Sequence, residues 1–233
     1  MKVVILAGGK GTRISETKNS IPKPLVKIGS KPIIHHIMLI FAKQGFNDFI
    51  VAGGYKYEML KEYFTKNKFP KSWKINVVNT GTLSMTGGRI FKLKKILNND
   101  FFCTYGDGIA NVNLNKILSL HKQARRIGTI TAVRPPARFG EIIIKKNLAV
   151  KFKEKPQTTD SWINGGFFIL SSKFFKYLKS SKDILEEQPL EKLSKEKQLS
   201  VYKHYGEWFC MDTPRDKDVL NKLYRKGKLN WIK

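Results

Sequence analysis

Apolar and polar positions alternate along this chain with two different periods. Residues 3–7 form an apolar run of strand length, whereas Pro32 to Gly45 places apolar residues three and four positions apart, as on one face of an amphipathic helix. Residues 48–54 and 74–78 predict two more strands, with a helix predicted over 57–66 between them. This order of strand, helix, strand, helix and strand predicts right-handed crossovers and a parallel sheet.

The same two periods continue through the rest of the chain. Further helices are predicted over residues 90–97, 113–127, 173–178 and 190–199, and further strands over residues 101–105, 129–133, 162–170, 200–205 and 208–211. Residues 141–145 and 149–152 resemble an antiparallel pair. The 233 residues contain no repeat, low-complexity tract or linker, so we expect one large α/β domain.

A long basic loop is predicted directly after the first strand. Helical periodicity resumes only at Ile33, and loops longer than ~12–15 residues are usually functional. The loop begins with Gly8-Gly9-Lys10-Gly11-Thr12-Arg13, and glycines followed by cations suit a backbone cradle for phosphate. Against one acid, Glu16, the loop carries six cations: Lys10, Arg13, Lys18, Lys23, Lys27 and Lys31. We expect an anionic ligand here; the alternative is a basic surface loop.

Two common phosphate-binding motifs are absent from the sequence. A P-loop requires Gly-Lys-Ser or Gly-Lys-Thr, and neither occurs. A dinucleotide fingerprint requires a third glycine after Gly9 and Gly11, but that position holds Ile14.

Two aspartates follow apolar strands that are far apart in sequence. Asp107 stands between glycines after residues 101–105, at the carboxyl end of a strand, where α/β sheets bind ligands. Asp212 follows residues 208–211 and precedes a predicted helix, with Thr213 as N-cap and Asp216 as reciprocal cap. The alternative role of Asp212 is therefore simple helix capping.

Other polar residues leave their roles open. Residues 80–89 suit either approach to a nucleotide or plain helix capping, with neither favoured. Asn164 suits sugar hydroxyls, and the glycine pair after it favours close approach of a ligand or of another backbone. His35 and His36 lack an acid at ligand spacing, so we expect structural roles for them, and His121 is predicted to be an amphipathic spacer.

The composition narrows the class of protein. The formal net charge is +26, but only eight of the 44 basic residues are arginine and the lysines are dispersed, so we expect no nucleic-acid partner. No apolar run approaches the ~18 residues of a membrane span, and we expect no membrane partner. Cys103 and Cys210 form neither a disulfide framework nor a zinc motif, and we expect both to lie buried beneath the two aspartates as unpaired thiols. Met1 lies directly before the first strand, so we expect no signal peptide. We therefore expect a reduced, cytoplasmic protein.

Several segments together resemble one family. Residues 6–13 with Pro22-Lys23-Pro24 resemble the signature of sugar-1-phosphate nucleotidylyltransferases, and further motifs of that family follow in order at residues 84–89, 104–108, 163–168 and 211–213. The resemblance extends from Met1 to about Lys226. It implies a Rossmann-like α/β fold with a mixed, mostly parallel sheet flanked by helices. It also implies a nucleotide-binding part over about 1–110, a sugar-binding part over about 111–212 and a C-terminal helix over about 213–227.

The resemblance further implies a reaction and its residues. CTP and glucose 1-phosphate would give CDP-glucose and pyrophosphate, a product that feeds deoxysugar and surface-polysaccharide biosynthesis, and we expect a homo-oligomer. Asp107 and Asp212 would hold one Mg²⁺, so we expect their nearest carboxylate oxygens to lie within roughly 3–5 Å of each other. Arg13 would bind the departing phosphates, and Lys23 would neutralise the α-phosphate. The implied nucleotide contacts are Leu6, Ala7, Gly8, Gly9, Lys10, Gly11, Thr12, Arg13, Lys23, Ser84, Arg89 and Gly106. The implied sugar contacts are Gly140, Glu154, Lys155, Asn164 and Gly165.

The chain departs from the family pattern in three places. Lys10 stands where an apolar residue is more frequent, Asn79 replaces an acid, and the segment between Phe64 and Asn79 is shorter. These changes bear on base choice and oligomer contacts more than on the chemistry. The alternatives are a family member that uses another base or sugar phosphate, a non-catalytic sugar-nucleotide sensor, and a nucleic-acid-binding protein. A sensor would not need both aspartates and Lys23.

Overall fold

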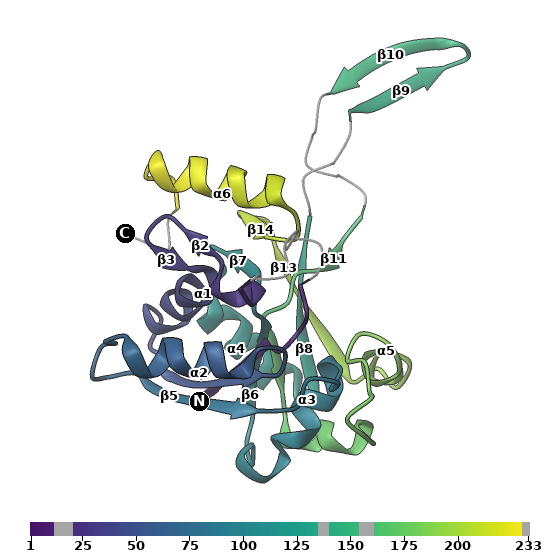
Figure 1. Ribbon diagram of the computed structural model, residues 1–233. Coiled ribbons are helices and arrows are strands. Elements are labelled where there is room, and N and C mark those ends of the chain that lie inside the picture. The colour runs from purple at the N-terminus through teal and green to yellow at the C-terminus, as the bar shows by residue number, and fades with distance from the viewer. Residues whose placement is uncertain (12–20, 135–139, 154–160, 230–233) are drawn as a thin grey trace.

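A central eight-stranded sheet organises the computed structural model, which describes residues 1–11, 21–134, 140–153 and 161–229 (Figure 1). Seven of its strands follow the order β11-β8-β12-β6-β1-β4-β5. The eighth strand, β13, pairs with β8 along its whole length, whereas β11 and β12 pair with opposite ends of β8. Their bounds are β1 Lys2–Ala7, β4 Asp48–Gly53, β5 Lys74–Asn79, β6 Phe101–Tyr105, β8 Gly128–Val133, β11 Ile163–Asn164, β12 Phe168–Leu170 and β13 Leu199–His204.

The sheet is mixed, with a parallel half around β1. Strands β6, β1, β4 and β5 are mutually parallel, as the βαβ rhythm of the first hundred residues predicts, and β13 is parallel to β8. The short strands β11 and β12 run antiparallel to their neighbours. The expected α/β fold with a mixed, mostly parallel sheet flanked by helices is confirmed.

Helices cover both faces of the sheet because side chains of β1 alternate between two apolar cores. Val3 and Ile5 pack with α1 and α4 on one face, whereas Val4 and Leu6 pack with α3 and α5 on the other. The helices are α1 Ile33–Ala42, α2 Tyr57–Lys66, α3 Thr86–Lys92, α4 Leu114–Ala124, α5 Gln188–Lys195 and α6 Pro214–Arg225. Short 3₁₀ helices are η1 Lys23–Leu25, η2 Lys94–Ile96 and η3 Ser172–Tyr177.

Three two-stranded ladders lie outside the main sheet. Strands β2 Lys27–Ile28 and β3 Lys31–Pro32 pair beside α6, and β7 Gly108–Ala110 pairs with β14 Trp208–Cys210. The predicted pair β9 Glu141–Lys145 and β10 Leu148–Lys153 is an antiparallel hairpin that projects away from the body (Figure 1). Among the described residues, no helix has the length and apolar character that crossing a membrane requires.

Several predicted elements differ from the structure. The described end of the long basic loop contains η1 and the β2–β3 pair, because its last residues fold back on one another. The third helix begins at Thr86 rather than at residue 90, and the helix predicted over 190–199 ends at Lys195. Residues 162–170 form two strands, since Gly166 and Phe167 adopt positive φ angles of 75° and 50°.

His121 is also not the spacer that its position in an amphipathic pattern predicts. Its ring is 4% exposed, and its Nδ1 lies 2.8 Å from the Thr129 hydroxyl, while its Nε2 lies 3.6 Å from an Asp100 carboxylate oxygen. The ring therefore joins α4 to β8. As expected, His35 and His36 have structural contacts: His35 stacks on Phe69, and Nε2 of His36 lies 2.9 Å from the Ile28 carbonyl oxygen.

Candidate active site

A cleft of about 570 Å³ lies at the carboxyl ends of β1 and β6. It receives residues from the glycine loop, from η1, from the segment before α3 and from the two strand ends that carry the aspartates. Its described lining is Leu6, Ala7, Gly8, Gly9, Lys10, Gly11, Lys23, Pro24, Thr82, Leu83, Ser84, Met85, Thr86, Arg89, Tyr105, Gly106, Asp107 and Asp212. The described part of the glycine loop, Lys23 and both aspartates therefore open onto one cleft.

Lys23 joins the two aspartates inside this cleft. Its Nζ donates to Asp107 Oδ2 at 2.5 Å and to Asp212 Oδ1 at 2.6 Å. The side chain of Lys23 is only 11% exposed, and those of the aspartates are 25% and 18% exposed. Such a partly desolvated cation between two carboxylates is held more strongly than a surface ion pair.

The β7–β14 ladder brings the two aspartates together. Asp107 precedes β7 and Asp212 follows β14, and Cys210 pairs with Gly108 in the antiparallel register. The Met211 N–H donates to the Asp107 carbonyl at 3.0 Å, which fixes the end of the ladder. The ligand atoms of Asp107, Cys210 and Asp212 all lie within 4.8 Å of one another. This confirms the predicted closeness of the two carboxylates.

A capping box at the start of α6 settles the alternative role of Asp212. The Thr213 hydroxyl accepts from the Asp216 N–H at 3.3 Å, and the Asp216 carboxylate accepts from the backbone N–H groups of Asp212 and Thr213. Because Thr213 is the cap, the Asp212 side chain remains directed at Lys23.

The charges of the site follow from these contacts. Burial by itself lowers the pKa of Lys23, but the Asp107 charge and the hydrogen bonds to both carboxylates outweigh it, so the pKa lies above its ordinary value. Burial, reinforced by Asp107, raises the pKa of Cys210 to about 12, so this thiol stays protonated at neutral pH. Lys23 is therefore a fixed positive charge, while Cys210 is neutral.

The two cysteines differ in their surroundings. Cys103 is a fully buried free thiol on β6, as predicted. The prediction that Cys210 would be equally buried beneath the site is wrong, because Cys210 is half-buried and its Sγ lies beside the two aspartates. All three residues of β14 are partly exposed, and Cys210 shares that exposure.

Arg89 is a buried side chain that holds the glycine loop in place through hydrogen bonds. Its guanidinium is 4% exposed and donates to the carbonyls of Gly8 at 2.7 Å and Gly81 at 2.9 Å, and to the Thr80 hydroxyl at 2.8 Å. A Cβ on Gly8 would lie 2.1 Å from the guanidinium carbon, so only glycine allows this approach. Arg89 thereby ties the loop after β1 to the segment before α3.

The glycine loop offers backbone donors to the cleft. The N–H groups of Gly9, Lys10 and Gly11 donate to no other residue within the described part of the chain. Consecutive N–H groups beside a cation are the arrangement that binds phosphate oxygens. Thr12 and Arg13, which the sequence assigned to the same loop, lie outside the described residues.

The glycine pair of α3 packs against protein instead of lining the cleft. Ser181 and Asp183 place their carbonyls over the start of this helix, where they accept from the N–H groups of Met85 and Gly88 at 2.9 Å. A Cβ on Gly88 would lie 2.0 Å from the Ser181 oxygen. No side chain of residues 80–89, all of which the structure describes, caps the helix; the carbonyls of Ser181 and Asp183 cover its start, and close packing against them explains the glycines. Ser84 and Arg89 line the cleft.

The structure describes only some of the residues that were predicted to contact a sugar. Glu154 and Lys155 lie outside the described residues, and the described lining of the cleft does not include Gly140, Asn164 or Gly165. Asn164 nevertheless contacts the wall of the cleft: its Nδ2 donates at 2.9 Å to the hydroxyl of Tyr105, which is one of the lining residues. The bond between Tyr105 and Glu186 could not be predicted from the sequence, since Glu186 lies in a polar stretch without a motif.

The fold and this cleft define a nucleotide-binding α/β protein, and comparisons with known proteins narrow the class. A model of the nucleotidyl transferase family matches residues 2–212. The chain belongs to this family, and it is a sugar-1-phosphate nucleotidylyltransferase.

Particular relatives agree with that assignment. A Bacillus subtilis protein named "Probable glucose-1-phosphate cytidylyltransferase" is 41% identical over 99% of both chains. "Glucose-1-phosphate cytidylyltransferase" of Salmonella typhimurium is 38% identical over 99% of this chain and 98% of its own. A crystal structure of HddC from Yersinia pseudotuberculosis, complexed with GMP-PN, has a TM-score of 0.76 at 24% identity and covers 96% of this chain and 99% of that one. That last similarity supports the fold.

Proposed function

We propose that this chain is a glucose-1-phosphate cytidylyltransferase, which converts CTP and glucose 1-phosphate into CDP-glucose and diphosphate. The observation that carries the proposal is the cation of Lys23, held between Asp107 and Asp212 beside the glycine loop. The names of the relatives that are 41% and 38% identical support the choice of CTP and glucose 1-phosphate. The product would feed deoxysugar and surface-polysaccharide biosynthesis.

In this reaction an oxygen of the sugar phosphate attacks the α-phosphorus of the nucleotide. A new P–O bond forms, the bond to the β-phosphate breaks, and diphosphate leaves with the bonding electrons. Both substrates are anions, so positioning and neutralisation of charge provide most of the catalysis. Lys23 would reduce the repulsion between the two phosphates as they approach. Arg13 would bind the departing β- and γ-phosphates.

Asp107 and Asp212 fit Mg²⁺, because both carboxylates converge on a single cation, Nζ of Lys23. Carboxylate oxygens are preferred ligands of Mg²⁺, whereas a protonated thiol such as that of Cys210 is not. When bound, the ion would neutralise phosphate oxygens. With both carboxylates engaged by the ion, the Lys23 ammonium would be available to the substrates.

The remaining contacts divide between the nucleotide and the sugar. The N–H groups of the glycine loop would bind phosphate oxygens, and Arg89 would keep that loop in place. The proposed nucleotide contacts are Leu6, Ala7, Gly8, Gly9, Lys10, Gly11, Thr12, Arg13, Lys23, Ser84, Arg89 and Gly106. The proposed sugar contacts are Gly140, Glu154, Lys155, Asn164 and Gly165.

A substrate matrix tests the proposal. Pyrophosphate release is measured for CTP, UTP, dTTP, GTP and ATP, each against glucose, mannose and galactose 1-phosphate, with and without Mg²⁺. We expect CTP with glucose 1-phosphate to have the highest kcat/KM, and its turnover to need Mg²⁺. If another nucleotide is used at least tenfold better, the cytidylyl assignment is wrong. The expected homo-oligomer is tested separately by light scattering after size exclusion.

A further inference from the structure

A chain of hydrogen bonds runs along the wall of the cleft from Asn164 to Thr86 at the start of α3. Glu186 accepts from the Tyr105 hydroxyl through Oε1 at 2.5 Å and from the Thr86 hydroxyl through Oε2 at 2.6 Å. The Tyr105 oxygen in turn accepts from Asn164 Nδ2 at 2.9 Å. Tyr105 and Thr86 both line the cleft, so the chain lies along its wall.

Glu186 is held in place although its side chain is exposed. It lies in the segment between η3 and α5, next to Leu185, which is fully buried and whose N–H donates to the Thr86 hydroxyl at 2.9 Å. The same segment supplies the Ser181 and Asp183 carbonyls that cover the start of α3. These contacts fix the backbone on which the Glu186 carboxylate stands.

The acceptor oxygens of Glu186 set the direction of the bonds from Tyr105 and Thr86. An ionised carboxylate only accepts, so the Tyr105 hydroxyl must donate to Glu186 and is left to accept from Asn164. Burial, together with Glu186, raises the pKa of Tyr105, which keeps its proton. The Asn164 amide must then present Nδ2 to Tyr105, and its Oδ1 accepts from the Gly166 N–H at 2.9 Å.

We propose that Glu186 is a positioning residue that acts through Tyr105 to hold the Asn164 side chain in place for the hydroxyl groups of a hexose 1-phosphate. The inference rests on the proposed function. With both internal bonds made, the amide still has one N–H and one lone pair for a sugar hydroxyl. If Glu186 were removed, the Tyr105 hydroxyl would lose the acceptor that fixes its direction. The Asn164 side chain would then rely on the bond from the Gly166 N–H to stay in place.

Three variants and one control test the proposal. Glu186→Ala removes the acceptor, and Tyr105→Phe removes the hydroxyl while keeping the ring that packs edge-on against Phe168. Glu186→Gln keeps an acceptor for Tyr105 and a donor for Thr86. Glu187→Ala removes the same charge from the next position, which is also exposed.

We expect Glu186→Ala and Tyr105→Phe to raise KM for the sugar phosphate about tenfold, the effect of one lost hydrogen bond of ordinary strength. KM for the nucleotide and kcat should stay within about threefold. Glu186→Gln keeps the acceptor for Tyr105 and should recover most of the affinity for the sugar phosphate that Glu186→Ala loses. The control Glu187→Ala should match the wild type. A purely structural role would instead lower thermal stability and the active fraction while leaving KM unchanged, and that result would overturn the proposal.

The proposal and the proposed function fail in different ways. The kinetic tests use whichever nucleotide and sugar phosphate the wild type turns over fastest, so they do not depend on CTP. If no pair reacts, the proposed function is wrong, but crystal structures of Glu186→Ala and Glu186→Gln still test the inference. An Asn164 amide that keeps its bonds to Tyr105 and Gly166 without Glu186 would contradict it.

Discussion

Lys23 and Asp212 are 189 positions apart, yet Nζ of Lys23 donates to Oδ1 of Asp212 at 2.6 Å. The same ammonium reaches Asp107, 84 positions away, at 2.5 Å. Three distant segments therefore meet at one cation: η1, the turn between β6 and β7, and the residues before α6. The predictions below concern this meeting point, its support and the charge of the whole chain.

Replacing Lys23 should lower turnover more than binding. In Lys23→Ala the positive charge that faces the developing negative charge on the α-phosphate is lost, so we expect kcat to fall by ~10²–10³-fold with a smaller change in KM. Steady-state kinetics of pyrophosphate release measures both constants. Lys61→Ala, on the exposed side of α2, is the control and should behave as the wild type. Normal turnover of Lys23→Ala would remove this residue from the mechanism.

Binding of Mg²⁺ should depend on the two aspartates and not on the neighbouring thiol of Cys210. Asp107→Asn and Asp212→Asn each remove a negative oxygen ligand, so we expect the affinity for Mg²⁺ to fall at least tenfold in each. Mn²⁺ binding followed by electron paramagnetic resonance measures this without turnover. Cys210→Ser should leave the affinity for either ion within twofold. Unchanged binding in both aspartate variants would place the ion elsewhere.

Loss of Arg89 should destabilise the fold and loosen the glycine loop together. Arg89→Met leaves the carbonyls of Gly8 and Gly81 without their charged donor, which we expect to cost ~2–4 kcal/mol of unfolding free energy. At this chain length that corresponds to a fall in Tm of roughly 5–12 °C. KM for the nucleotide should rise as well. Lys94→Met, an exposed change just after α3, should alter neither quantity.

Acid should destabilise the protein through its histidines. Burial, with the charges of Lys31 and His36, lowers the pKa of His35 to about 4, while the unfolded chain titrates near 6.5. The unfolded state therefore binds more protons in this window, so stability is full above pH 6.5 and falls as pH drops toward 4. The pKa values of His36, His121 and His204 are also lowered by burial, and they act in the same direction.

The variant His35→Phe tests this sign. The ring would still stack on Phe69 and face Trp73, but it would lose its contact with the Tyr63 hydroxyl, 3.2 Å from Nδ1. We expect the decrease in Tm between pH 7 and pH 4.5 to be a few degrees smaller than in the wild type. An equal decrease in both proteins would show that His35 does not contribute.

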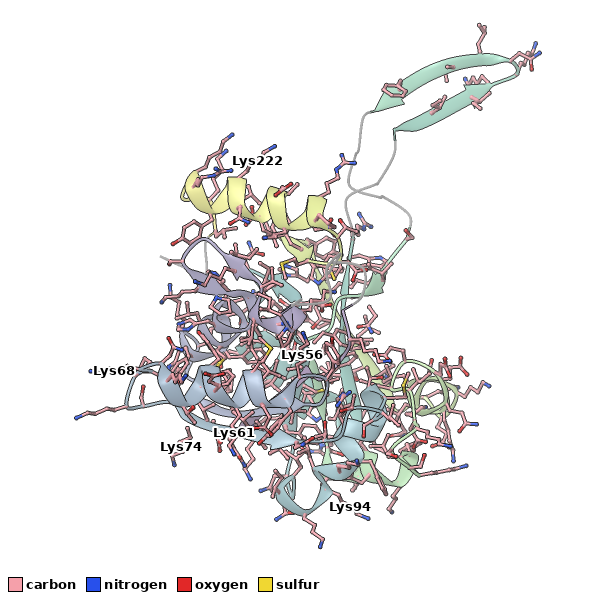
Figure 2. The ribbon with its side chains drawn as sticks, viewed as in Figure 1. Lys56, Lys61, Lys68, Lys74, Lys94 and Lys222 are labelled. Carbon is pink, nitrogen blue, oxygen red and sulfur yellow. The ribbon has the colours of Figure 1, made fainter. Side chains whose placement is uncertain are left out.

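The net charge of +26 should give only weak binding to nucleic acid. Lysines at well-separated places, such as Lys68, Lys94 and Lys222, project outward from different elements (Figure 2), and few can reach one phosphate backbone together. Binding to random duplex DNA should therefore be lost by physiological salt in a fluorescence-anisotropy titration. Sub-micromolar binding at that salt would reveal a nucleic-acid partner.

Much of the fold follows from short-range features of the sequence. The period of apolar residues predicts β6 and α2 at their observed bounds, and Thr213-Pro214 with Asp216 predicts the capping box of α6. Each of these depends on contacts within a few residues, which a single sequence contains in full. The candidate site was found in the same way, because glycines after one strand and an aspartate after another lie at the same edge of a parallel sheet.

Tertiary structure alone decided how the polar groups are paired. Each of these pairings depends on residues that are distant in sequence and that packing brings together. Examples are the direction of the Asp212 carboxylate, the partners of Arg89, the burial of His121 and the bond between Tyr105 and Glu186. From the sequence, residues 80–89 had two interpretations, and only the packing of Ser181 against Gly88 explains the glycine there. Periodicity tells which face of an element is buried, but it does not tell which distant group meets that face, since the meeting depends on how the layers close over one another.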